Sequence, residues 1–411
     1  MQFKYVKDYL VYGLGQFINL STPLIVTPIL INNYGIDKFG EISVAFSVFL
    51  ILSILVDFGS SINGVKMISS FSENELEIFR YLNQVISLKI IITFSILLLT
   101  IIGLIILDIE NKFLFAGGLF ILLGQLTNVN WIYQGIEKFN YINYINFFSK
   151  SIYLTLIIIF TNLNLEYSYI LFLFGTSNLL VNTYFLNKIF KDYNLKINLS
   201  DRKLSFQFIE DLPIVVSNLS ITYSSNITIL FVKYFLGDFA AGIFKIGDTI
   251  LGLVKSYLAV FFNVSFPKFC KKMTLDYKEG FQYFKRINNY NLVLIIFINL
   301  ILILIIKLLI QNTNIEGLAP EYFLYYSVFP LIGIVISMNI PFYQTLLFFN
   351  HQKVISFISF VTVVVVTISG YFGLKYFNLY GSLFALLLAE IVNTGLFFYF
   401  YKKFVSDLVK N

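Results

Sequence analysis

The stretch that decides the fold is residues 84–107, QVISLKIIITFSILLLTIIGLIIL, in which Lys89 is the only charged residue. A helix needs about 20 predominantly apolar residues to cross the hydrocarbon core of a bilayer. This run is longer than that, and much of the remaining sequence has the same character. The stretch therefore predicts a helix that spans a membrane.

The composition extends this prediction to the whole chain. Of its 411 residues, 58% are hydrophobic, 18% are aromatic and only 13% are charged, and the mean hydropathy is +0.80. Soluble globular proteins carry about 25% charged residues. Twelve spans would use roughly 240 residues, so the loops are short and a sizeable soluble domain is excluded.

Apolar runs between polar clusters predict an all-α integral membrane protein with about twelve transmembrane helices. Polar residues are most frequent in the fourth and tenth runs. The expected spans are residues 9–31, 41–65, 84–107, 113–133, 144–161, 167–186, 212–235, 240–266, 290–310, 322–349, 354–376 and 379–401.

The basic residues predict the orientation. The net charge is +6, from 29 Lys and Arg against 23 Asp and Glu. With the N-terminus inside, the inner loops and helix ends hold 22 of the 29 basic residues. Cytoplasmic loops of membrane proteins retain Lys and Arg, so both termini are expected in the cytoplasm. This explanation of the positive charge needs no nucleic-acid partner.

A long polar stretch at residues 187–211 separates six expected spans from six. We therefore predict an N-terminal lobe over residues 1–195, with helices 1–6, and a C-terminal lobe over residues 196–411, with helices 7–12. Because each half has an even number of spans, the halves would be parallel repeats.

Weak internal similarity supports these repeats. GIDKFG at residues 35–40 has a counterpart in GDFAAG at residues 237–242, an offset of 202 residues. Chance similarity between apolar segments is the alternative. At the same offset, two further pairs match: Gln16 with Asn218, and Lys66 with Lys268.

The sequence gives no support for an enzyme. Cys270 is the only cysteine and His351 the only histidine, which excludes an internal disulfide, a cysteine metal cluster and paired-histidine zinc sites. The phosphate-loop pattern G-x-x-x-x-G-K-[ST] is missing. No catalytic residues, no metal and no cofactor are expected; coupling to an H⁺ or Na⁺ gradient stays open.

Charged residues inside spans are candidates for function, because a charge in hydrocarbon costs several kcal/mol unless it faces protein or water. Lys255, near the middle of the eighth span, either pairs with Asp248 or another acid to hold helices together, or lines a central cavity that favours an anionic substrate. At about 100° per residue, one face of this span collects Lys245, Asp248, Gly252, Lys255, Ser256 and Asn263.

Two other spans carry polar faces. Gln16 and Asn19 lie on one side of the first span, and Asn218 lies on the seventh. Hydrogen bonds between helices, worth about 0.6 to 2 kcal/mol in membranes, would explain these residues. A cavity shared with the eighth span is the other interpretation.

Three further charges lie in the spans. Asp57, in VDFG at the inner end of the second span, either pairs with a basic loop residue or lines the mouth of the cavity. Lys89 is expected to extend its amine from an inner helix end to the interface. Glu390, in the twelfth span, is either a buried hydrogen-bonded acid or a proton carrier.

Three motifs follow one another along the chain: residues 15–59, which run from GQ through YGIDKFG to VDFG; residues 130–139, NWIYQGIEKF; and residues 235–267, which contain FLG, IFKIG and FP. In this order they resemble bacterial O-antigen-unit flippases of the Wzx type. The likeness covers essentially the whole chain in length, span count and motif order.

The resemblance implies a member of the multidrug/oligosaccharidyl-lipid/polysaccharide (MOP) exporter superfamily with a MATE-like fold, in which two six-helix lobes enclose a central cavity. Such proteins move undecaprenyl-pyrophosphate-linked oligosaccharide repeat units across the bacterial inner membrane for O-antigen, lipopolysaccharide or capsule synthesis. The implied partners are this lipid-linked oligosaccharide, membrane lipids and other polysaccharide-assembly membrane proteins.

The resemblance also suggests roles for the candidate residues. Lys255, with Lys245 as an accessory, would attract the pyrophosphate or an acidic sugar. Gln16, Asn19 and Asn218 would hydrogen-bond sugar hydroxyls.

Two alternatives stay open. A MATE-type, cation-coupled multidrug exporter would be expected to line its cavity with acids, whereas the deepest charge here is Lys255. A polytopic glycan polymerase or transferase usually needs a large outer loop or a metal-binding pair of Asp residues, and every outer loop expected here is short.

Overall fold

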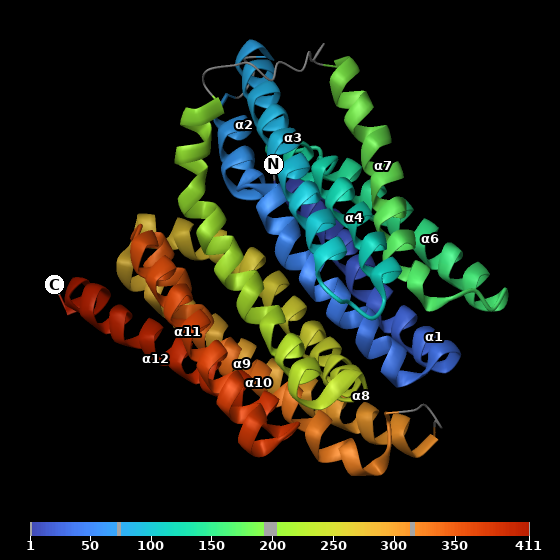
Figure 1. Ribbon diagram of the computed structural model, residues 1–411. Coiled ribbons are helices and arrows are strands. Elements are labelled where there is room, and N and C mark those ends of the chain that lie inside the picture. The colour runs from blue at the N-terminus through green and yellow to red at the C-terminus, as the bar shows by residue number, and fades with distance from the viewer. Residues whose placement is uncertain (1, 72–74, 193–203, 313–316, 411) are drawn as a thin grey trace. The chain divides into compact units, whose positions relative to one another are not determined.

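The computed structural model describes residues 2–71, 75–192, 204–312 and 317–410, and only the backbone of residues 2–20, 70, 71, 75, 204–210, 213, 267, 278 and 405–410. Every regular element in the described ranges is a helix (Figure 1). The α-helices are α1 (Gln2–Asp57), α2 (Val65–Phe71), α3 (Glu75–Ile106), α4 (Lys112–Leu126), α5 (Asn130–Gly135), α6 (Phe139–Asn162), α7 (Ile170–Asp192), α8 (Leu204–Leu275), α9 (Tyr277–Asn312), α10 (Phe323–Phe348), α11 (Gln352–Phe377) and α12 (Tyr380–Lys410). Short turns of π-helix (Ser60–Gly64) and 3₁₀-helix (Tyr167–Tyr169 and Pro320–Tyr322) complete the set.

Ten segments of the described chain are long and apolar enough to span a membrane. Two of them have 37 and 62 residues, far more than one crossing requires. Each contains one glycine with non-helical backbone angles, Gly35 in α1 and Gly237 in α8. The ten segments are roughly consistent with the number expected from the sequence, and a total of twelve stays a prediction.

The fourth expected span consists of two helices. α4 ends at Leu126 and α5 begins at Asn130, with Thr127–Val129 between them in non-helical conformation. Hydropathy alone does not reveal this interruption, because apolar residues lie on both sides of it. Irregular backbone at membrane depth is tolerated only where it is buried in protein or lines a cavity.

Contacts divide the chain into two compact units. The first contains Met1–Tyr34 and Glu41–Asn226, and the second contains Gly35–Gly40 and Ile227–Asn411. The predicted boundary between residues 195 and 196 lies outside the described residues and stays a prediction.

Small residues let helices approach closely within each unit. In the first unit, Gly117 of α4 lies against the backbone of Phe172 in α7. In the second unit, Gly373 of α11 and Gly381 of α12 lie against each other's backbone. Such contacts are typical of membrane helices, whose association depends on close van der Waals packing.

The Gly35–Gly40 segment packs within the second unit against the matching turn of α8. Gly40 lies against the backbone of Asp238, and Gly242 lies against the backbone of Ile36. The two glycines are 202 residues apart, and each lacks room for a side chain because of the opposite turn.

The backbone repeats its irregular positions in the two halves. Gly35 (φ 82°, ψ 167°) and Gly237 (φ 84°, ψ −176°) have nearly the same angles. In the later part of each half the offset is larger, 213 or 214 residues in place of 202, partly because α9 and the connection that follows it are longer than α3 and its connection. These matching turns support a duplicated scaffold over chance similarity. Two further pairs share a positive φ: Glu137 (58°) with Asn350 (59°), and Asn164 (53°) with Asn378 (50°).

Candidate functional site

The polar face predicted on the eighth span lies in the α8 part of the second unit, and none of its six residues is buried. On the other side of the helix, Leu251, Val254 and Leu258 are only 1%, 1% and 3% exposed. Beyond the helix itself, no heavy atom of a described residue lies within 4 Å of the position that a Cβ on Gly252 would occupy. The second unit therefore leaves a charged and polar face of this helix partly exposed.

Lys245 and Asp248 form an ion pair on this face. The Lys245 Nζ lies 2.8 Å from Asp248 Oδ2, and the two side chains are 26% and 24% exposed. Asp248 therefore pairs with Lys245, three residues away. One interpretation of the sequence expected Asp248 to pair with Lys255, and that pair is not formed.

Lys255 has a different environment. No carboxylate of a described residue lies within 4.0 Å of its amine. The acid whose charge acts on it is Glu390 of α12, which accepts a hydrogen bond from the Asn393 side chain. Thr362 Oγ1 in turn donates to Asn393 Oδ1 at 3.3 Å. Lys255 therefore has an acidic neighbour without being held in a close ion pair.

Asp57 lies at the end of α1 in the first unit and is 5% exposed. Positive φ angles at Phe58 and Gly59 end the helix directly after it. Its carboxylate accepts hydrogen bonds from the hydroxyls of Ser60 (2.9 Å) and Ser61 (2.8 Å) and from the Gln125 amide (3.1 Å). The acid thus connects the second span to the end of α4.

Lys89 of α3 belongs to the same network. It is 2% exposed, its Nζ donates to Ser60 Oγ at 3.3 Å, and its charge interacts with Asp57. The expected extension of this amine to the interface is wrong. Ser60 and Asp57 stabilise the charge of Lys89 inside the protein. Neither interpretation of Asp57 predicts an interaction with Lys89.

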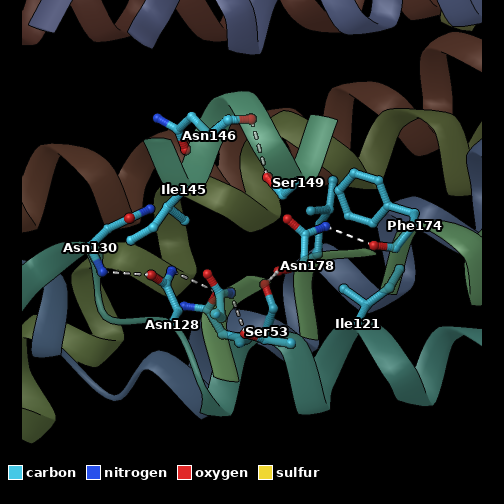
Figure 2. Close-up of a pocket in the computed structure, with 13 residues that line it drawn as sticks. Ser53, Ile121, Asn128, Asn130, Ile145, Asn146, Ser149, Phe174 and Asn178 are labelled. Atoms are coloured by element: carbon cyan, nitrogen blue, oxygen red, sulfur yellow. Dashed lines mark hydrogen bonds between the residues drawn. The ribbon is translucent and has the colours of Figure 1, made fainter. Parts of the chain in front are cut away.

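A cavity of about 160 Å³ lies in the first unit beside the interruption between α4 and α5 (Figure 2). Sequence analysis missed this cavity because its amides come from separate spans. The only local signals are the Asn residues at 128 and 130 in the fourth run and at 178 and 182 in the sixth. We call it the amide cavity, for its lining residues Gln125, Asn128, Asn130, Asn146, Asn178 and Asn182.

Some of these amides satisfy the interrupted backbone. The Asn182 Nδ2 donates to the carbonyl of Gly124 at 2.9 Å, and Asn128 Oδ1 accepts from the backbone N–H of Asn130 at 3.0 Å. Asn128 also donates to Gln125 Oε1 at 3.3 Å, and so links the cavity to Asp57. The cavity and the buried charge pair are therefore neighbours in one hydrogen-bond network.

The remaining predicted residues are distributed as follows. Gln16 and Asn19 belong to the part of α1 whose side chains lie outside the described residues. Asn218 is half-buried in α8, within the first unit, whereas Lys245, Asp248 and Lys255 belong to the second. A cavity shared by these spans stays a prediction.

Comparison with known proteins identifies relatives over almost the whole chain. A curated relative described as "Putative O-antigen transporter", from Escherichia coli (strain K12), is 20% identical over 351 residues, 84% of each chain. An inward-facing MATE family multidrug resistance transporter of the MOP superfamily superposes with a TM-score of 0.68 at 14% identity, covering 98% of this chain and 96% of the other. A MOP superfamily transporter from Pyrococcus furiosus gives 0.61 at 14% identity, with 99% and 96% covered.

The family model described as "Polysaccharide biosynthesis protein" matches residues 5–273. Together with the ten apolar segments and the MATE-like fold, this match indicates a multi-pass membrane transporter and not an enzyme. The chain belongs to the polysaccharide biosynthesis protein family.

Proposed function

We propose that the protein is a flippase that moves undecaprenyl-pyrophosphate-linked oligosaccharide repeat units across the bacterial inner membrane by alternating access. The units supply the synthesis of O-antigen, capsule or another surface polysaccharide. A polar glycan and a charged pyrophosphate do not cross about 30 Å of hydrocarbon unaided, whereas a polyprenyl tail remains in lipid.

The observation that carries this proposal is the partly exposed polar face of α8. Lys255 lies on it, half-buried and without a close ion pair. Lipid would penalise such a face, so we infer that it lines water and meets the head group of the substrate. Lys255 would attract the pyrophosphate or an acidic sugar, Lys245 would assist, and Gln16, Asn19 and Asn218 would bind hydroxyls.

Deletion of the gene tests the function. We expect surface polysaccharide to be lost and lipid-linked saccharide to accumulate on the inner leaflet. Lys255→Gln should reproduce the defect with normal amounts of protein in the membrane, and Lys255→Arg should retain part of the activity. If deletion left the polysaccharide intact and sensitised cells to cationic drugs, the multidrug-exporter alternative would replace the proposal.

Cysteine labelling tests the aqueous face directly. Cys270 is the only native cysteine, so Cys270→Ser provides a cysteine-free background. In it, Gly252→Cys should react with a water-soluble maleimide in membranes, whereas Leu251→Cys, at a position 1% exposed, should not. Equal protection of both positions would contradict a hydrated face.

The orientation is tested by reporter fusions. The distribution of basic residues supports both termini in the cytoplasm. A reporter fused after the last residue should therefore be active only in the cytoplasm, and periplasmic activity would reverse the topology.

A further inference from the structure

The amide cavity contains more hydrogen-bonding capacity than the interrupted helix uses. Asn130 Oδ1 is buried and has no hydrogen-bond partner among the described residues. The Asn146 side chain makes no hydrogen bond to a described residue, and Asn178 donates only to the Phe174 carbonyl, at 2.8 Å, which leaves its own oxygen unused. A buried polar atom without a partner costs free energy, about 1–3 kcal/mol, so a ligand or water is expected there.

The second half shows that the scaffold does not require these amides. The turn residues Asn164 and Asn378, with φ of 53° and 50°, set an offset of 214 residues between α7 and α12. At that offset, Asn178 corresponds to Val392 and Asn182 to Leu396. The matching region of α10 continues as a helix through Pro341 with no interruption. The interruption and its amides are thus particular to the first half.

Size and charge select the class of ligand. A cavity of about 150 Å³ accommodates a six-membered ring such as benzene, and the volume here is about 160 Å³. No charged residue lines it. The nearest acid in its network, Asp57, already accepts bonds from Ser60, Ser61 and Gln125. A bare cation would be too small for this space and would lack a carboxylate.

The unused groups are mainly amide oxygens, which accept hydrogen bonds from hydroxyl groups. The rest of the lining is apolar and includes Ile121, Ile145 and Phe174. A sugar ring combines hydroxyl donors at its edge with C–H groups on its faces, and so matches both parts of this lining.

We propose that the amide cavity binds one uncharged sugar ring of the transported glycan. This inference rests on the proposed function and adds a glycan-binding subsite in the first unit, distinct from the α8 face assigned to the pyrophosphate. Asn130, Asn146 and Asn178 would accept hydrogen bonds from its hydroxyls.

The test uses two lipids as probes for the purified full-length protein: the lipid-linked saccharide extracted from cells that lack the transporter gene, and sugar-free undecaprenyl pyrophosphate. Asn146→Leu and Asn178→Leu should each weaken binding of the saccharide lipid at least tenfold and leave binding of the sugar-free lipid unchanged. Asn146→Leu breaks no hydrogen bond among the described residues, so it stays informative if Asn178→Leu folds poorly.

Asn312→Leu is the matched control. Asn312 donates to a carbonyl four residues earlier, at 2.9 Å, as Asn178 does, but lies outside the cavity. The Asn312→Leu variant should bind both lipids as the wild type does.

Three results would overturn the subsite. The first is that the two cavity variants bind both lipids as the wild type does. The second is that the variants bind both lipids more weakly and to the same degree. The third is that the variants lose binding of Na⁺ and not binding of the saccharide lipid. If the wild type bound neither lipid more tightly than phosphatidylglycerol, the proposed function itself would fail. This result comes from the wild type alone, so it is distinguishable from a failure of the subsite.

Discussion

The third span of each half buries a polar side chain at the same position, but only one of the two is charged. α3 begins at Glu75 and α9 begins at Tyr277, 202 residues later. At this offset Lys89 corresponds to Asn291, and both are 2% exposed. Identical residues confirm the register near the start of the two helices: Glu77 with Glu279, Phe79 with Phe281, and Tyr81 with Tyr283.

The partners of the two side chains differ in the same way. Lys89 interacts with Ser60 and the acid Asp57, whereas Asn291 accepts a hydrogen bond from the Tyr257 hydroxyl at 2.9 Å. One duplicated position is thus filled by a charge pair and the other by a neutral pair. Because the neutral pair suffices in the second half, we infer that the fold does not require the charges of the first.

Removing one charge should have the largest effect on stability. Lys89→Met removes the positive charge that acts on the buried Asp57 carboxylate, which keeps its hydrogen bonds to Ser60, Ser61 and Gln125. Removing one of two interacting buried charges typically costs about 3–5 kcal/mol. We expect a loss of this size in the free energy of unfolding, measured by chemical denaturation in mixed micelles. A loss below that caused by Asn291→Leu would mean that the two positions do not differ as described.

Gly237→Ala should have an intermediate effect. Its φ of 84° with ψ of −176° is a region that essentially only glycine occupies, and forcing another residue into it costs about 1–3 kcal/mol. Within the part of the chain that the structure describes, no neighbour lies within 4 Å of the added Cβ, so the measured loss in unfolding free energy reports the backbone alone. Gly103→Ala, in regular helix with equal space, is the control and should be neutral or stabilising.

The neutral pair of the second half should contribute less. Tyr257→Phe removes one hydroxyl hydrogen bond to Asn291, and we expect a loss of about 1 kcal/mol in the free energy of unfolding. A loss as large as that of Lys89→Met would show that the neutral pair contributes as much to the free energy of unfolding as the charged one.

The smallest effect on stability is expected when both charges are removed together. Replacing two interacting buried charges together is often close to neutral. The free energy of unfolding of Asp57→Asn combined with Lys89→Gln should therefore lie within about 1 kcal/mol of the wild-type value. If the pair serves transport, the same variant should make no surface polysaccharide. If the double variant made a normal amount of surface polysaccharide, the two charges would have no role in transport.

The sequence predicts the fold well because long apolar runs leave few structures possible in lipid, and because the glycines at 35 and 237 mark equivalent turns. It fails where partners come from different spans. Lys89 is close to an inner helix end, and only the fold brings Ser60 and Asp57 to it. Likewise, no local pattern brings Asn146 and Asn178 to the same cavity.

The interruption of the fourth span is also invisible to hydropathy. Thr127 and Asn128 interrupt the apolar run only briefly, and an average over a window as long as a span does not resolve a break of three residues. The polar face of α8 was easier to predict, since it depends on the periodicity of a single helix.

Trp131 is the second residue of α5, just after the interruption, and is the only tryptophan in the chain. Its indole N–H donates to the carbonyl of Asn128 at 3.0 Å, and its ring centroid is 6.0 Å from the Lys89 amine. Intrinsic fluorescence excited at the indole band therefore originates at one place, between the amide cavity and the buried charge pair. The unlabelled protein carries its own optical reporter of sugar binding and of neutralisation of that pair.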